Sequence, residues 1–143
     1  MKLSIASDHA GFEMKGQLID FLKENGHEVK DFGTHSSEAA DYPDISHPVA
    51  RSVAEGEAEM GVLMCGSGIG VSVTANKHAT IRAALCWRKE IAELCRQHNN
   101  ANIICLPSRF ISLEEAKEML TIFLGTAFDG GGRHERRVSK ISC

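Results

Sequence analysis

Short, mostly apolar runs alternate along the chain with longer segments whose apolar residues recur at helical spacing. The short runs predict β-strands over residues 3–6, 27–31, 62–65, 81–86 and 102–106. The longer segments predict helices over residues 12–25, 44–57, 88–98 and 113–124, and one more helix between a glycine-rich turn and Lys77. In the first helix, Phe12, Leu18 and Leu22 lie on the apolar side, and Gly26 ends the helix.

Regular alternation of strand and helix indicates a parallel sheet covered on both faces, since right-handed crossovers place helices on each side. We therefore expect the α/β class, as a three-layer Rossmann-like fold with a five-stranded parallel sheet and a C-terminal helical tail. No repeat or low-complexity linker interrupts the pattern, which predicts one domain over residues 1–143.

Ligands of such sheets bind beyond the carboxyl ends of the strands, where the strand order switches direction. The segments that follow the predicted strands are therefore the candidate functional positions. They are residues 7–9, 65–70, 86–87 and 107–109.

The most informative segment is residues 65–77, CGSGIGVSVTANK, which follows a buried strand. Gly66, Gly68 and Gly70 let the backbone turn tightly and present N–H groups to an anion. Such groups favour the thiolate form of Cys65, and they can also stabilise an oxyanion that develops on a substrate. The pattern suits proton abstraction beside a carbonyl, although a cysteine in an apolar strand is more often a packing residue.

The composition is that of an ordinary globular protein, with 43% hydrophobic residues, 24% charged residues and a net charge of −3. These values give no electrostatic reason to expect nucleic acid or an anionic membrane surface as a partner. No apolar run approaches the roughly 20 residues of a membrane span. Charge also follows Met1 too soon for a signal peptide.

The five cysteines are an odd number and form no C-x-x-C pair. This pattern favours a reduced, cytoplasmic protein over a secreted, disulfide-bonded one. Cys95 and His98 have metal-ligand spacing, but no second ligand pair follows at a suitable distance, so we expect no metal and no other cofactor. A thiol redox sensor is a further hypothesis, and the lack of a resolving cysteine close in sequence weighs against it.

Two other interpretations of the glycine-rich segment agree less well with the sequence. A dinucleotide site requires G-x-G-x-x-G after the first strand and an acidic residue at the end of the next strand. Here the spacing differs, the segment follows the third predicted strand, and the next strand ends at Cys86. A receiver-like phosphoacceptor requires an aspartate where this chain has Cys65.

The C-terminal tail breaks the alternation with three consecutive glycines and a basic segment after them. If the segment is helical, Arg133 and Arg137 stand on one face and can bind a phosphate together; a solvated basic end is the alternative. His98, at a helix end, is either a favourable charge there or a general acid–base. Asp8 and His9 either cap the first helix or hydrogen-bond to hydroxyl groups.

Taken together, these segments resemble the type B ribose-5-phosphate isomerase family, which includes galactose-6-phosphate isomerase subunits. The matching segments are residues 7–11 (SDHAG), 41–43 (DYP), 65–70 with 75–77 (CGSGIG and ANK), 96–102 (RQHNNAN), 108–109 (SR) and 132–134 with 137 (GRH and R). Any one of them could arise by chance, whereas the whole set, in order and over nearly the whole chain, makes the resemblance strong.

The resemblance implies metal-free interconversion of an aldose phosphate and a ketose phosphate, ribose 5-phosphate by default, in the pentose phosphate pathway. It also implies a homodimer whose active sites draw on both subunits, with the tail 129–143 reaching the partner. Cys65 matches the base that moves a proton between C2 and C1 through a cis-enediolate. Ser67 matches a hydroxyl that shuttles protons between O1 and O2, and His98 matches the residue that opens the furanose ring. Substrate contacts match Asp8, His9, Tyr42, Gly66, Gly68, Ile69, Gly70 and Asn99, and phosphate contacts match Arg109, Arg133 and Arg137.

Three departures from the family pattern bear on these roles. Ser67 replaces the threonine of many relatives and keeps the hydroxyl. Val71 stands where a related branch has a glutamate base, which leaves Cys65 as the candidate. Arg136 could replace one of its arginine neighbours as the phosphate ligand.

The substrate and the assembly stay open at this stage. Allose 6-phosphate, galactose 6-phosphate and a four-carbon ketose phosphate are alternative substrates. A non-catalytic sugar-phosphate binding module is the alternative from another class. The sequence does not distinguish a dimer from a tetramer.

Overall fold

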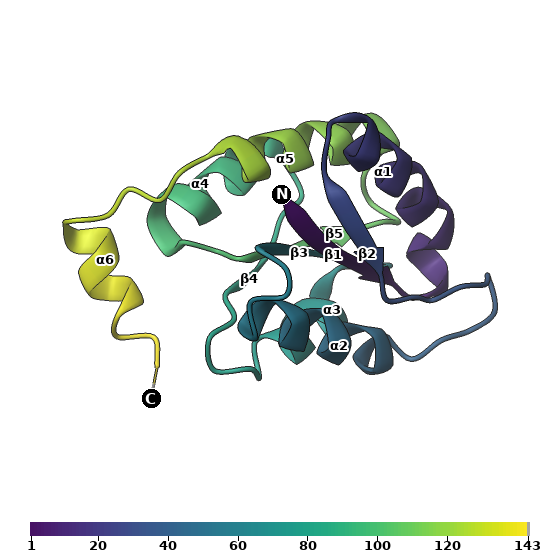
Figure 1. Ribbon diagram of the computed structural model, residues 1–143, viewed down its shortest axis with the longest axis horizontal. Helices are drawn as coiled ribbons and strands as arrows, with labels where there is room; N and C mark the ends of the chain where they lie inside the picture. Colours follow the sequence, from purple (N-terminus) through teal and green to yellow (C-terminus); the bar gives the residue numbers. More distant parts are fainter. Residues whose placement is uncertain (143) are drawn as a thin grey trace.

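The sheet is entirely parallel, and its strand order is β2-β1-β3-β5-β4. The computed structural model, which describes residues 1–142, places helices on both faces of this sheet (Figure 1). The strands are β1 (Lys2–Ser7), β2 (Glu28–Asp31), β3 (Met60–Cys65), β4 (Ala83–Leu85) and β5 (Ile103–Pro107). The predicted fold, a three-layer α/β arrangement with a helical tail, is confirmed.

A helix follows each strand in the chain, and α1 to α5 form the two outer layers. The helical elements are the 3-10 turn η1 (His9–Gly11), α1 (Phe12–Glu24), α2 (Tyr42–Ala54), α3 (Ile69–Ala75), α4 (Lys89–Asn99), α5 (Leu113–Gly125) and α6 (Arg133–Val138). Helices α1, α4 and α5 cover one face of the sheet, and α2 and α3 cover the other (Figure 1).

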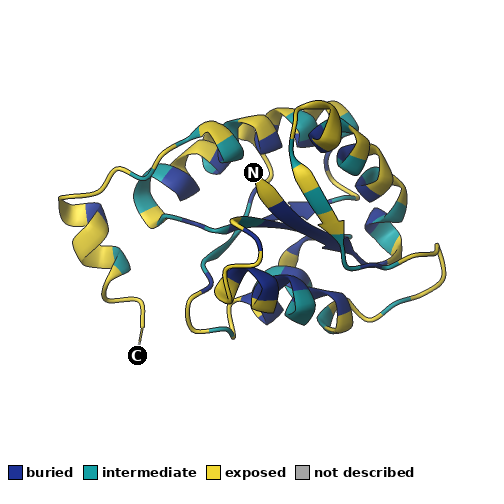
Figure 2. Ribbon diagram, viewed as in Figure 1, coloured by how far each residue is buried: buried dark blue, intermediate teal, exposed yellow. Residues whose placement is uncertain are grey.

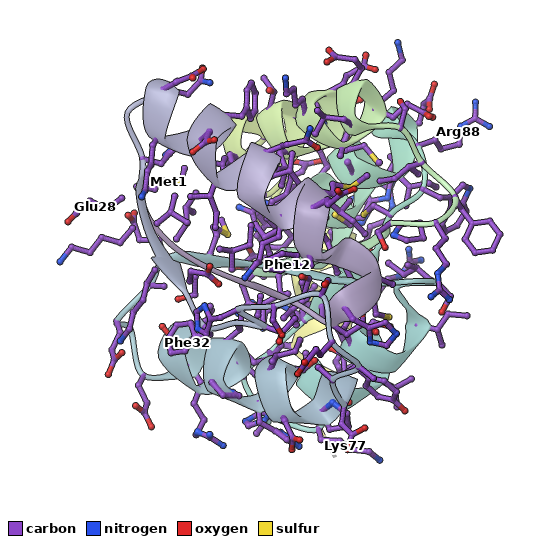
Figure 3. The ribbon with its side chains drawn as sticks, turned by 90° about the vertical axis from the view of Figure 1, so that its right-hand side faces the viewer. Met1, Phe12, Glu28, Phe32, Lys77 and Arg88 are labelled. Atoms are coloured by element: carbon purple, nitrogen blue, oxygen red, sulfur yellow. The ribbon has the colours of Figure 1, made fainter. Side chains whose placement is uncertain are left out.

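The two faces of the sheet support separate hydrophobic cores. Leu18 of α1 and Phe123 of α5 pack in one core, and Val49 of α2 and Val71 of α3 pack in the other. The central strands are therefore buried on both faces (Figure 2), as the apolar runs predict. Figure 3 shows side chains filling the space between the sheet and each helical layer.

Several element boundaries differ from the prediction by one to three residues, and two of these differences have a local reason. Helix α2 begins at Tyr42, before the predicted start at residue 44, because Pro43 in the first helical turn needs no hydrogen-bond acceptor. Strand β4 is shorter than predicted because the N–H of Ile81 closes a turn with the carbonyl of His78, 3.0 Å away, and does not join the ladder.

The switch point of the sheet lies between β1 and β3, because the chain leaves β1 toward one edge and returns to pair on its other side. Backbone hydrogen bonds tie together the segments that follow β1, β3 and β5. Asp8 N donates to Met64 O (3.2 Å), and Ser108 N donates to Cys65 O (3.0 Å). These bonds make the carboxyl edge of the sheet a rigid platform.

Helix α6 lies beside α4, apart from the sheet (Figure 1). The basic segment of the tail is a six-residue helix, which is the conformation in which Arg133 and Arg137 stand on one face. Within residues 1–142, no helix combines the length and apolar character needed to cross a membrane.

Candidate functional site

The segment after β3 makes a turn that only glycine allows at its centre. Cys65 ends β3 and is 5% exposed. Gly68 has a φ of +74°, and a Cβ there would lie 2.5 Å from Cδ1 of Leu85. The left-handed backbone and the close approach of β4 both exclude a side chain, so the turn stays tight beside the thiol.

The turn presents backbone N–H groups beside the thiol. Within residues 1–142, the N–H groups of Ser67, Gly68 and Gly70 have no hydrogen-bond acceptor, whereas Ile69 N donates to Oγ of Ser67 at 3.2 Å. Ser67 is exposed, and its hydroxyl proton is still available to donate. The structure therefore places a thiol, a hydroxyl and unpaired donors on one short loop, a set that can hold a developing oxyanion.

Two side chains from other parts of the chain pack against this loop. The ring of Tyr42, at the start of α2, is so close to Gly70 that a Cβ on the glycine would lie 2.7 Å from its Cζ. The guanidinium of Arg109 lies over Gly66, whose Cβ would be 3.1 Å from Nη1. Tyr42 and Arg109 thus flank the loop from its two sides.

Asp8 and His9 lie on the turn after β1, on the other side of the switch point. Oδ1 of Asp8 accepts from Ala10 N (3.0 Å), so this carboxylate caps η1, and the carboxylate is mostly buried. Nδ1 of His9 accepts from Ala40 N at 3.2 Å, which leaves Nε2 to carry the proton of the neutral ring. Together with Tyr42, they line a pocket of about 410 Å³.

A second group of predicted residues lies at the opposite edge of the sheet. His98 and Asn99 form the last turn of α4, and the imidazole of His98 stacks on that of His134 from α6. The ring centroids are 4.0 Å apart and the planes differ by 12°. Arg133 and Arg137 stand exposed on the same short helix.

Arg96 is a structural residue of this second group that the sequence analysis did not assign. It is 8% exposed, and its guanidinium donates to Ala101 O (2.6 Å) and Thr126 O (3.1 Å). It therefore fixes the end of α4 to the start of the tail. The only signal in the sequence is its place in the RQHNNAN segment, beside His98.

The two groups cannot meet within one chain. Cys65 stands at the carboxyl end of β3, whereas α4 leads into the amino end of β5, where Ile103 pairs with Gly61. A six-residue strand such as β3 is about 20 Å long. The thiol and the imidazole of His98 therefore lie at opposite edges of the same sheet.

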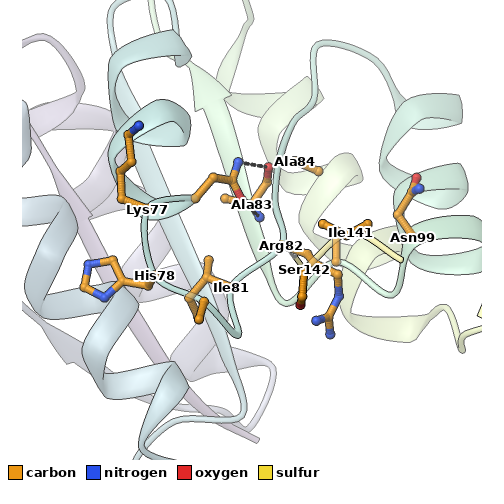
Figure 4. Close-up of a pocket in the computed structure, with 12 residues that line it drawn as sticks. Lys77, His78, Ile81, Arg82, Ala83, Ala84, Asn99, Ile141 and Ser142 are labelled. Carbon is orange, nitrogen blue, oxygen red and sulfur yellow. Dashed lines mark hydrogen bonds between the residues drawn. The ribbon is translucent and has the colours of Figure 1, made fainter. Parts of the chain in front are cut away.

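A hollow lies beside the second group, between β4 and the tail (Figure 4). It has a volume of about 630 Å³ and is bordered by Arg82, Asn99 and Ile141 among others. Across residues 1–142, no three His, Cys, Asp or Glu side chains gather closely enough to hold a metal ion.

The fold and the loop define a class: an open parallel α/β protein with a thiol and unpaired N–H donors beside the switch point of its sheet. Residues 3–141 match the Ribose/Galactose Isomerase family, and the chain belongs to that family. The resemblance expected from the sequence motifs is confirmed.

Individual members of the family are similar to this chain over almost its full length. The chain is 45% identical to Ribose-5-phosphate isomerase B of Escherichia coli over 142 residues, 99% of this chain and 95% of the relative. The structure of a ribose 5-phosphate isomerase from Thermotoga maritima has a TM-score of 0.96 at 50% identity, and covers 99% of this chain and 97% of its own. Ribose-5-Phosphate Isomerase B of Clostridium thermocellum also has a TM-score of 0.96, at 46% identity, covering 99% and 95%.

Proposed function

We propose that this protein interconverts ribose 5-phosphate and ribulose 5-phosphate, as the names of its relatives indicate for them. The observation that carries the proposal is the position of Cys65 at the start of a loop in which the N–H groups of Ser67, Gly68 and Gly70 lack acceptors within residues 1–142. Proton transfer between two adjacent carbons of a sugar needs a base at the carbons and donors at the oxygens.

In the proposed reaction, the thiolate of Cys65 removes the C2 proton of the open-chain aldose. The N–H groups of Gly68 and Gly70 stabilise the resulting cis-enediolate, and Ser67 moves a proton between O1 and O2. The Cys65 thiol then returns a proton to C1, which gives the ketose. Val71 carries no ionisable group, so Cys65 is the base of this loop.

Substrate binding is assigned to residues around the loop. Asp8, His9 and Tyr42 bind sugar hydroxyls, and Nε2–H of His9 is a donor because Nδ1 already accepts from Ala40. Arg109 binds the phosphate group from its place over Gly66. Gly66 and Ile69 complete the loop that holds the reacting oxygens.

We further propose that the working unit is a homodimer and that each site takes residues from both subunits. The support is the separation of the two groups, since His98 is required to open the furanose ring and lies at the edge of the sheet opposite its own Cys65. Asn99, Arg133 and Arg137 of one subunit would then bind the sugar and phosphate held by the partner's loop. The tail beyond residue 128 is the segment that reaches across.

Exposed apolar side chains on α3 support such pairing. Ile69 and Val73 stand one turn apart on that helix, and each is more than half exposed. We place them against the hollow that Asn99 borders, which would bring the partner's glycine loop to His98. The four free thiols of the described residues fit the proposed cytoplasmic location.

The test is turnover of ribose 5-phosphate by purified protein with a chelator present, compared with Cys65→Ala. We expect metal-independent turnover that falls by at least about a hundredfold in the variant, while phosphate-dependent binding persists. Cys95→Ser, a thiol outside the site, is the matched control and keeps its turnover. Full activity of Cys65→Ala would exclude this residue as the base.

Absence of turnover in the wild type would direct the assay to allose 6-phosphate, galactose 6-phosphate and four-carbon ketose phosphates. Binding of a sugar phosphate without any turnover would identify a binding module and contradict the proposal.

A further inference from the structure

Two cysteines that the proposed reaction does not use lie side by side in the core between α4 and the sheet. Cys86 follows β4 and is fully buried, and Cys95 lies in α4 and is 6% exposed. Their Sγ atoms are 3.8 Å apart and share a hydrogen bond. The fold thus supplies the partner thiol that the spacing of cysteines in the sequence does not reveal.

The surroundings make the two thiols unequal. The hydrogen bond from Cys86 lowers the pKa of the Cys95 thiol, burial opposes this shift, and the positive charge of Arg96 supports it, so the pKa is lowered overall. Donation of that hydrogen bond, together with burial, raises the pKa of Cys86. Cys95 is therefore the sulfur that ionises first, and it is also the one with some contact with solvent.

We propose that Cys86 and Cys95 are a modification site at which a hydroperoxide oxidises the two thiols to a reversible intrachain disulfide. With hydrogen peroxide, the Cys95 sulfur attacks one peroxide oxygen and the O–O bond breaks. The hydroxide that leaves takes the Cys95 thiol proton, so a sulfenic acid and one water form. The Cys86 sulfur then attacks the sulfenic sulfur, the S–O bond breaks, and the hydroxyl leaves with the thiol proton as a second water. The two thiols lose two electrons together, and the peroxide gains them.

Formation of the disulfide changes the position of α4. A disulfide bond is about 2.05 Å long, so the sulfurs must approach by about 1.8 Å from their present separation of 3.8 Å. His98 lies one helical turn beyond Cys95, in the same helix. Under the proposed function, on which this effect alone depends, the disulfide lowers turnover by displacing the ring-opening histidine, and reduction restores it.

The chemistry can be mapped without any activity measurement. Trypsin cleaves after Arg88 and Arg96, which separates Cys86 from Cys95 and leaves each on its own peptide. The folded protein is treated with hydrogen peroxide, remaining thiols are alkylated, and the digest is analysed by mass spectrometry. We expect a linked pair of residues 83–88 with the peptide that ends at Arg96, and its loss on treatment with a reductant.

Cys95→Ser and Cys86→Ser separate the steps. We expect no linked peptide in either variant, a sulfenic acid trapped on Cys95 in Cys86→Ser, and unchanged basal turnover in Cys95→Ser. Oxidation of Cys65 alone, sulfinic acid at Cys95 in the wild type, or no reaction of either thiol would each overturn the proposal. Because the linked peptide is independent of turnover, its formation stands even if the protein isomerises no sugar.

Discussion

Gly70 illustrates how one missing side chain shapes the proposed site. The ring of Tyr42 occupies the space that a Cβ would need, with the nearest ring carbon at 2.7 Å. A glycine is therefore needed at this position to leave room for the Tyr42 ring. It lets the first turn of α2 lie directly against the first turn of α3.

We predict that Gly70→Ala displaces the Tyr42 ring and destabilises the fold by about 1–3 kcal/mol, as overpacking does. Under the proposed function, KM for the sugar phosphate rises because Tyr42 leaves the pocket. Urea unfolding and steady-state kinetics measure the two effects. Gly16→Ala, on an exposed position of α1 with no atom within 4 Å of the new Cβ, is the control and gains about 0.5–1 kcal/mol.

His134 acts on the proposed reaction through His98, so we regard it as a positioning residue. We predict that His134→Ala lowers turnover of the cyclic sugar by about ten- to a hundredfold, since the His98 ring loses the surface that orients it. His134→Phe keeps a stacking ring and recovers part of the loss. Equal turnover of wild type and His134→Ala would show that the stack has no role in ring opening.

At the scale of elements, the tail contacts α4 through the stack of His134 on His98. Burial, and then the charges of His98 and Arg133, lower the pKa of His134 below its ordinary value. Arg137 acts in the same direction and Asp129 opposes it. A docked His134 therefore binds a proton less readily than a free one.

We predict that docking of α6 is complete above the ordinary histidine pKa of about 6.5 and weakens as the pH falls through it, because protonation then favours the undocked tail. Hydrogen exchange of the α6 amides, corrected for intrinsic rates, between about pH 7.5 and about pH 5.5 measures the change. His134→Phe stacks without titrating, so its docking should not change with pH. Equal weakening in both proteins would assign the effect to another group.

Elements differ in how well local sequence predicts them. The alternation of apolar runs and helical periods predicts all five strands and the helices between them. Each of these patterns lies within one continuous segment of the chain, so it can be recognised without knowing the tertiary structure. The start of α2 and the length of β4 were predicted less accurately. The first depends on the tolerance of a helix start for Pro43, and the second on a turn between Ile81 and His78.

At the scale of the whole molecule, the proposed site needs two chains. We predict that a hybrid dimer of one Cys65→Ala chain and one His98→Ala chain has about half the turnover of the wild-type dimer, since one of its two sites keeps both residues. The hybrid is isolated by two different affinity tags after co-expression. Each parent homodimer should be nearly inactive on the cyclic sugar.

The matched control combines Cys65→Ala with Ser67→Ala, two changes on the same loop. Every site of that hybrid carries one of the changes, so its turnover should not exceed that of the more active parent. An inactive hybrid of Cys65→Ala and His98→Ala would show that each site uses both residues from a single chain.

The sequence by itself determined the fold class, the glycine loop after a buried strand, the basic tail and the resemblance to the isomerase family. These features depend on residues that are neighbours along the chain, where periodicity and backbone freedom act directly. Only the tertiary structure decided that Tyr42 lies on Gly70, that His134 stacks on His98, and that Cys86 meets Cys95. It also placed Cys65 and His98 at opposite edges of the sheet. Such contacts join separate elements, and their distances follow from how the elements pack.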